Sequence, residues 1–149
     1  MNASARRIVV GVDGSESSRA ALRWAIEQAA LTGAAVDAVM AWQYPTGTVD
    51  RLSGPEADFE ATTRDALAQV LEQESGPRSD VSVRSVVAQG HPADVLVRGS
   101  SDAELLVVGS RGIGGFVSAI VGSVSLQCVL HAQCPVLVLR DGREGQAQA

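Results

Sequence analysis

The chain contains no lysine, so all 12 of its basic residues are arginines. This absence excludes the Walker A loop, the protein kinases and the receiver domains of two-component systems, because each of these uses a lysine in its phosphate chemistry. Any phosphate group that the chain binds must be met by backbone N–H groups, hydroxyls, arginine or a metal ion. Aromatic residues are also scarce, at 3% of the sequence, which disfavours a flavodoxin-like electron carrier.

Long apolar runs and an excess of basic charge are missing as well. No run approaches the roughly 18 residues of a membrane helix, and the apolar run that starts at Ile8 ends at Asp13, too early for the core of a signal peptide. We therefore expect a soluble, cytoplasmic protein without a membrane partner. The net charge of -5 argues against a nucleic-acid-binding surface, which needs a basic face.

Only two cysteines are present, Cys128 and Cys134. In the cytoplasm, where thiols are kept reduced, we expect two buried, reduced thiols rather than a disulfide. With His131 between them they form the pattern C-x2-H-x2-C, which provides three potential zinc ligands. No fourth ligand with a familiar spacing lies nearby, so the pattern disfavours a zinc site.

Apolar, β-branched runs alternate with segments of helical periodicity along the chain. Its 149 residues, 46% of them hydrophobic, predict one globular domain over residues 1–149, with residues 141–149 as a loose polar tail. The predicted strands are residues 7–12, 35–42, 81–87, 105–108 and 135–140, and the predicted helices are residues 17–31, 55–75, 91–98 and a short one after residue 123. This alternation predicts an α/β fold, an open, doubly wound parallel sheet in the order 3-2-1-4-5 with helices on both faces.

Residues typical of turns follow the first and the fourth predicted strand. Asp13 ends the first strand and Gly109 ends the fourth, and the order 3-2-1-4-5 makes these strands neighbours. Parallel sheets bind ligands beyond the carboxyl ends of their strands, where the strand order reverses. We therefore expect a binding site between these two strand ends.

The segment over residues 109–125, GSRGIGGFVSAIVGSVS, is the most informative part of the chain. Glycines allow the backbone to approach a ligand closely, and N–H groups in such a loop and at the start of the next helix favour an anion. The hydroxyls of Ser123 and Ser125 can donate further hydrogen bonds, and Arg111 is the only cation in the segment. The pattern indicates phosphate binding. The alternative is a flexible connection in which Ser123 merely caps the last helix.

The spacing G-x2-G-x9-G-S in this segment resembles the nucleotide-binding signature of the ATP-binding universal stress proteins. Three further segments, in the same order along the chain, are similar to that family: IVVGVDGS over residues 8–15, GHPA over residues 90–93 and CPVLV over residues 134–138. The resemblance covers almost the whole chain. It implies the Rossmann-like fold of the adenine nucleotide alpha hydrolases and a bound adenine nucleotide, ATP or else ADP or AMP, with Mg²⁺.

The resemblance also implies roles for particular positions. Asp13 matches the acidic residue near the ribose and the phosphate-bound metal, and Gly14 lies in the same turn. Val12 and Ala41 match positions that contact adenosine. The phosphate site is implied for the residues of the glycine-rich segment: Gly109, Arg111, Gly112, Gly122, Ser123, Val124 and Ser125.

The expected function is regulatory nucleotide binding in a stress response rather than turnover. The sequence has no lysine, no histidine in a position to act as a general base, and no group of residues that would activate a nucleophile. Slow magnesium-dependent hydrolysis remains an alternative. Another alternative is a nucleotide-independent dimeric interaction module. Residues 136–139 are continuously apolar yet predicted to form an edge strand, which invites pairing with a second chain. Members of the family pair through this strand, so we expect a homodimer, with burial beneath the tail as the alternative.

The remaining histidines and tryptophans have simpler interpretations. His91 precedes a proline at a helix start and is expected to be a capping or turn residue. His131 is expected near the end of the last helix, where a cation favours the helix dipole. Trp24 and Trp42 are expected to pack in the interior, although Trp42 could wall the adenine pocket.

Overall fold

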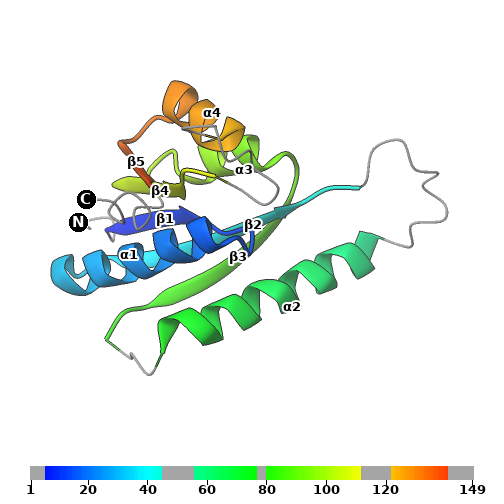
Figure 1. Ribbon diagram of the computed structural model, residues 1–149, viewed down its shortest axis with the longest axis horizontal. Coiled ribbons are helices and arrows are strands. Elements are labelled where there is room, and N and C mark those ends of the chain that lie inside the picture. Colours follow the sequence, from blue (N-terminus) through cyan, green and yellow to red (C-terminus); the bar gives the residue numbers. More distant parts are fainter. Residues whose placement is uncertain (1–5, 45–55, 77–79, 112–121, 141–149) are drawn as a thin grey trace, which may run out of the picture.

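The computed structural model describes residues 6–44, 56–76, 80–111 and 122–140. Five parallel strands form one sheet in the order β3-β2-β1-β4-β5, as the sequence predicted (Figure 1). The elements are β1 (Arg7–Gly11), α1 (Glu16–Thr32), β2 (Ala35–Trp42), α2 (Glu56–Ser75), β3 (Val83–Gln89), α3 (Pro92–Gly99), β4 (Leu105–Gly109), α4 (Ser123–His131) and β5 (Val136–Leu139).

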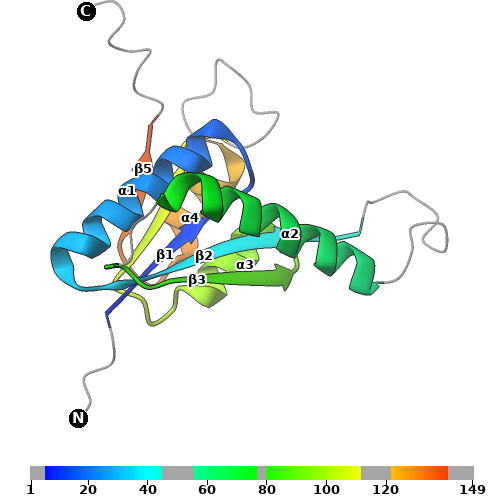
Figure 2. The same cartoon turned by 90° about the horizontal axis from the view of Figure 1, so that it is seen from below.

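The helices cover the sheet in two layers. Figures 1 and 2 show α1 and α2 on one face and α3 and α4 on the other. Alternate residues of the central strands pack into the two layers: Ile8 and Val10 of β1 face the α1 side, whereas Val9 faces the α3 side. All three are fully buried. A strand covered on both faces needs a continuous apolar run, which explains the sequence of β1.

Helix ends follow local capping chemistry. The Ser15 hydroxyl accepts a hydrogen bond from the Ser18 N–H and caps α1, which ends at Gly33 in the left-handed conformation with a φ of 82°. The imidazole Nδ1 of His91 accepts a hydrogen bond of 3.3 Å from the Ala93 N–H at the start of α3. The predicted capping role of His91 is thereby confirmed.

One carboxylate lies within the sheet. Asp37, the third residue of β2, is 4% exposed and accepts hydrogen bonds from Arg7 at 2.9 Å and from Arg84 at 2.8 Å. Burial alone would raise the pKa of Asp37, but the hydrogen bonds from the two arginines outweigh it and hold the pKa below its usual value. Asp37 is therefore a charged group of the fold, remote from the strand ends where the binding site is predicted.

Several predicted element boundaries differ from the structure by one or two residues, and β3 and α1 are examples. The strand predicted over residues 81–87 runs from Val83 to Gln89, because its pairing with β2 continues to the partner of Trp42. The first helical turn of α1 also begins one residue earlier than predicted, at Glu16. Pro55 and the predicted tail over residues 141–149 lie outside the described residues.

The last helix and strand carry an apolar surface. Leu126, Val129 and Leu130 of α4 are 48%, 50% and 62% exposed. β5 lies at the edge of the sheet next to β4, and all four of its residues are half-buried. Within the described ranges, no helix is long and apolar enough to cross a membrane.

Candidate functional site

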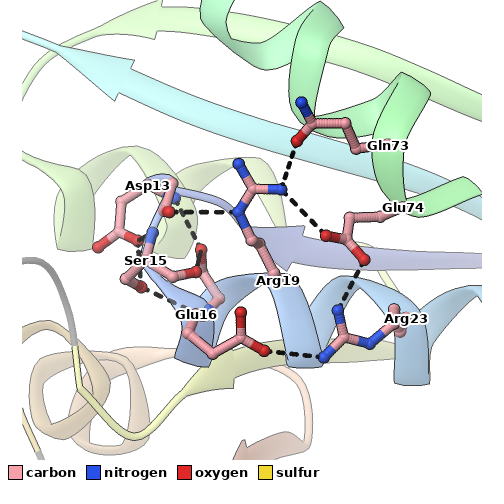
Figure 3. Close-up of polar contacts among 9 residues, drawn as sticks. Asp13, Ser15, Glu16, Arg19, Arg23, Gln73 and Glu74 are labelled. Atoms are coloured by element: carbon pink, nitrogen blue, oxygen red, sulfur yellow. Dashed lines mark hydrogen bonds and ion pairs between the residues drawn. The ribbon is translucent and has the colours of Figure 1, made fainter.

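The turn after β1 is held together by its own side chains. The Asp13 carboxylate oxygen Oδ1 accepts hydrogen bonds from the Ser15 N–H at 3.0 Å and from the Ser15 hydroxyl at 2.6 Å (Figure 3). The Asp13 N–H in turn donates to the Ser18 hydroxyl at 3.2 Å. Gly14 between them has a φ of 87°, a conformation that favours glycine. The turn thus presents an exposed carboxylate beside the N-terminus of α1.

Gly109, at the end of β4, lies directly against the start of α1. A Cβ atom at this position would overlap the Ser17 hydroxyl and come within 2.7 Å of the Ser17 carbonyl carbon and oxygen. The Ser17 hydroxyl also accepts a hydrogen bond of 3.3 Å from the Arg111 N–H. Close packing of α1 on β4 therefore requires glycine at position 109, whether or not a ligand approaches it.

The start of α4 is fastened to the end of β4. The Gly122 N–H donates to the Ser110 carbonyl at 2.6 Å. The Ser125 hydroxyl donates to the Gly109 carbonyl at 3.0 Å and lies 3.5 Å from the Ser110 carbonyl. Ser125 is 2% exposed, so its hydroxyl serves this connection. Gly112, the remaining predicted glycine, lies outside the described residues.

Two helix N-termini meet at this edge of the sheet, and they differ in capping. α1 is capped by Ser15, whereas the N-cap of α4 is Gly122, which has no side chain to accept a hydrogen bond. The interpretation of Ser123 as the helix cap is therefore wrong: Ser123 is the first residue of α4, and it is exposed. The first N–H groups of a helix without a side-chain cap attract an anion.

The two positions implied for adenosine lie on neighbouring strands. Val12 directly follows β1 and donates its N–H to the Val39 carbonyl at 2.8 Å, which ties it to β2. The Ala41 side chain packs in the α3 layer, whereas the Val12 side chain packs in the α1 layer. The two side chains therefore pack on opposite faces of the sheet, and both positions lie toward its carboxyl edge.

Trp42 belongs to an aromatic cluster with Tyr44 and Phe59. Its ring is stacked on Phe59 at a centroid distance of 5.9 Å and meets Tyr44 edge-on at 5.5 Å. Trp42 is 7% exposed, and Trp24 packs against the core on the α1 side. The expectation that both tryptophans are packing residues is confirmed. The Trp42 cluster connects the end of β2 to the first turns of α2.

The described residues offer few protein ligands for a cation at this strand edge. In the parts of the chain that the structure describes, no three His, Cys, Asp or Glu side chains group together as a metal site. Asp13 is an exposed carboxylate at this edge. Mg²⁺ in nucleotide sites is commonly bound by one or two carboxylates together with phosphate oxygens and water, so the residues present fit this ion in a nucleotide complex.

Sequence reasoning missed the serines and the arginine behind the predicted site. Ser17 and Ser18 are buried and join α1 to the ends of β4 and β1, and Arg19 reaches the turn from the same helix. The only signal in the sequence is a run of small residues in the first turn of a helix opposite a glycine. Such a run is also compatible with simple helix capping. Only the tertiary structure therefore shows which strand ends these serines and Arg19 contact.

The fold and this strand edge define a doubly wound α/β domain of the class that binds ligands where its strand order reverses. The model of the universal stress protein family matches residues 4–140, and the chain belongs to this family.

Individual relatives show how far the similarity extends. A universal stress protein of Mycobacterium tuberculosis (strain H37Rv) is 39% identical over 138 residues, which are 90% of this chain and 45% of the relative. The chain spans about half the length of the curated relatives it matches. The structure of UspA from Lactobacillus plantarum has a TM-score of 0.77 and 26% identity and covers 93% of this chain and 100% of that chain. A universal stress protein in complex with cAMP has a TM-score of 0.67 and 25% identity, with 92% and 98% covered.

Proposed function

We propose that this universal stress protein binds an adenine nucleotide, ATP with Mg²⁺, at the carboxyl ends of β1 and β4. One observation carries the proposal: the Asp13 turn, the end of β4 and the uncapped start of α4 are joined by direct hydrogen bonds through Ser17, Ser18 and Gly122. A carboxylate for a metal and a helix N-terminus for an anion therefore lie at the same strand edge. The similar protein in complex with cAMP supports the adenine nucleotide as the ligand class.

Each part of the nucleotide has a proposed set of partners in this chain. The N–H groups of Ser123 and Val124 bind phosphate at the start of α4, and Arg111 adds positive charge at the end of β4. Asp13 binds the ribose or, through Mg²⁺, the phosphates. The adenine lies near Val12 and Ala41, where backbone groups of neighbouring strand ends can read its edge.

The biological role that we propose is regulation by binding rather than turnover. Bound nucleotide would change the surface beside α4 that a partner contacts. Slow hydrolysis through a magnesium-bound phosphate would be a side activity, because the sequence has no lysine and shows no nucleophile constellation.

A second candidate function rests on the apolar surface of α4 and β5. Half-buried Val136, Leu137, Val138 and Leu139 form an edge strand, and Leu130 of α4 is 62% exposed. We propose that a second copy of the chain pairs along β5, as an open apolar edge favours. Sedimentation velocity over a range of concentrations tests this homodimer with and without nucleotide; a dimer that forms without any nucleotide binding would favour the nucleotide-independent interaction module.

Calorimetric titration with ATP, ADP, AMP and cAMP, each with and without Mg²⁺, tests the nucleotide site. An aliquot of the purified protein is first denatured to detect any nucleotide that was purified with it. Saturable binding or released adenine nucleotide is expected. Absence of both in the wild-type protein would refute the proposed function.

A substitution pair localises the binding. Gly122→Leu places a bulky side chain at the start of α4, where the backbone φ of -73° accepts any residue. Gly99→Leu is the control, because a Cβ atom at Gly99 meets nothing within 4 Å. We expect the first variant to lose nucleotide binding and to keep its fold and oligomeric state, and the second to bind as the wild type does. Loss of the fold in the first variant would show that Gly122 is structural.

A further inference from the structure

Arg19 of α1 joins the Asp13 turn to the far end of another helix. Its Nε donates to the Gly14 carbonyl at 3.4 Å, whereas its NH1 donates to the Gln73 side chain at 2.8 Å and to the Glu74 carboxylate at 3.0 Å (Figure 3). Gln73 and Glu74 belong to the last turn of α2. One guanidinium group therefore bridges the loop of the proposed site and a helix that contributes none of the proposed site residues.

Glu74 is the anchor of this bridge. Its side chain is 12% exposed and lies between two arginines, Arg19 and Arg23, with Arg23 NH1 at 2.6 Å. Burial alone would raise the pKa of Glu74, but the hydrogen bonds from Arg23 and Arg19 outweigh it and keep the pKa below its usual value. Glu74 is thus held as a carboxylate, and it fixes the position of the Arg19 guanidinium.

Arg23 provides a natural comparison with Arg19. It pairs with the same carboxylate and, on its other side, with the exposed Glu16 at 3.0 Å. Among the described residues, its side-chain contacts therefore lie within α1 and between α1 and α2, and they do not include the turn. The two arginines share the stabilising contact between the helices, whereas the contact with the Gly14 carbonyl belongs to Arg19.

The Gly14 carbonyl is a sensitive point of the turn. Gly14 has a φ of 87°, and a glycine in a turn can rotate its peptide groups more freely than any other residue. The same peptide carries the Ser15 N–H, which holds the Asp13 carboxylate at 3.0 Å. A donor that fixes the carbonyl therefore also fixes the orientation of the N–H and, through it, the carboxylate.

We infer that Arg19 is a positioning residue for nucleotide binding, which orients the Asp13 turn from the C-terminal end of α2. The inference rests on the proposed function, since it assigns the support of that same site. The planar fork of arginine suits the role, because it can donate to several acceptors in fixed directions. By linkage, the nucleotide must in turn stabilise the contact of α2 with the turn.

Three variants test the inference by titration with ATP and Mg²⁺. Arg19→Ala is expected to weaken binding about fivefold, the effect of losing one modest hydrogen bond. Arg23→Ala breaks the same helix contact and is expected to bind as the wild type does, although both variants should unfold at lower temperature. Arg19→Lys keeps the positive charge without the fork and is expected to remain weakened.

Amide hydrogen exchange adds a readout that a purely structural role would not change. ATP is expected to slow exchange in the last turn of α2 in the wild type and in Arg23→Ala, and to have no such effect in Arg19→Ala. In the protein without nucleotide, the Ser15 amide should exchange faster in Arg19→Ala than in Arg23→Ala.

The outcomes separate the two proposals. Absence of binding in the wild type refutes the proposed function, and the inference with it. Equal affinities of Arg19→Ala and Arg23→Ala, in a wild type that binds, overturn the inference alone. Full recovery in Arg19→Lys also overturns it, because a general attraction between charge and phosphate would then explain the effect.

Discussion

The substitution Gly109→Ala examines how tightly α1 is packed on the sheet. The added Cβ atom would overlap the Ser17 hydroxyl and lie 2.7 Å from two backbone atoms of the same residue. Backbone of a helix cannot move away without shifting the whole first turn of α1. The contact therefore has to be relieved by separating α1 from β4.

Gly11 in β1 is a matched control because it lies one strand away at the same edge. A Cβ atom there would meet the Leu96 Cδ1 at 2.8 Å, which is the far end of a flexible side chain. Overpacking of a core costs about 1–3 kcal/mol. We expect about 1 kcal/mol for Gly11→Ala and about 3 kcal/mol or more for Gly109→Ala, out of a total stability of about 5–15 kcal/mol for a domain of ordinary size.

Urea unfolding at 25 °C, followed by circular dichroism without nucleotide, measures both costs. The double variant Gly109→Ala/Ser17→Ala removes the hydroxyl but keeps the backbone contact, so it should recover only part of the lost stability. Equal losses for Gly109→Ala and Gly11→Ala would refute the reasoning. Complete recovery in the double variant would show that the side chain of Ser17, and not the backbone of α1, sets the distance.

Three further predictions concern other parts of the chain. Asp37→Asn should lower the free energy of unfolding at pH 7 by about 2–3 kcal/mol, less than for a fully buried pair because Arg84 is exposed. The pKa of Asp37 is lowered in the folded state, so its contribution to the free energy of unfolding is present above its unfolded pKa of about 3.9 and is lost as the pH falls through the folded value. Urea titrations from pH 7 to pH 3 should therefore show the stabilities of the variant and the wild type converging. A constant difference between them would contradict this. Ser15→Ala should cost about 1 kcal/mol through loss of the α1 cap, measured by thermal unfolding, and an unchanged midpoint would show that the cap is dispensable. Burial raises the pKa of the Cys128 thiol to about 11, so a thiol reagent at pH 8 should modify Cys134 in the native protein and Cys128 only after unfolding; equal native rates would contradict the buried position.

Element order and sheet topology could be predicted because the central strands β1 and β4 contain continuous apolar runs. The LLVVG segment of β4 is apolar at every position before its glycine, as a strand buried on both faces must be. Strand boundaries were less predictable where a strand is half-exposed: β3 extends two residues further than its alternating pattern indicated, because its end is set by pairing with Trp42 of β2. Periodicity records which face is buried and not where a partner strand stops.

For the predicted site, too, the sequence predicted one part and the tertiary structure was needed for the other. Glycine and serine types at the ends of β1 and β4 were sufficient to predict a ligand site at this edge, because parallel strands bring their carboxyl ends together. The sequence did not reveal that Gly109 is required by Ser17, or that the hydroxyl of Ser125 is used to fasten α4 to β4. Both contacts join residues far apart in the chain.

By itself, then, the sequence determined the α/β class, the strand order and the family resemblance, because these depend on local periodicity, on the handedness of crossovers and on motifs within short segments. Only the tertiary structure decided which polar groups support the Asp13 turn. The contact between Arg19 and Glu74 spans 55 positions of the chain, and many arginine and glutamate residues could have formed a similar pair. Their meeting depends on how α1 and α2 pack side by side on the sheet, a geometry that no local pattern encodes.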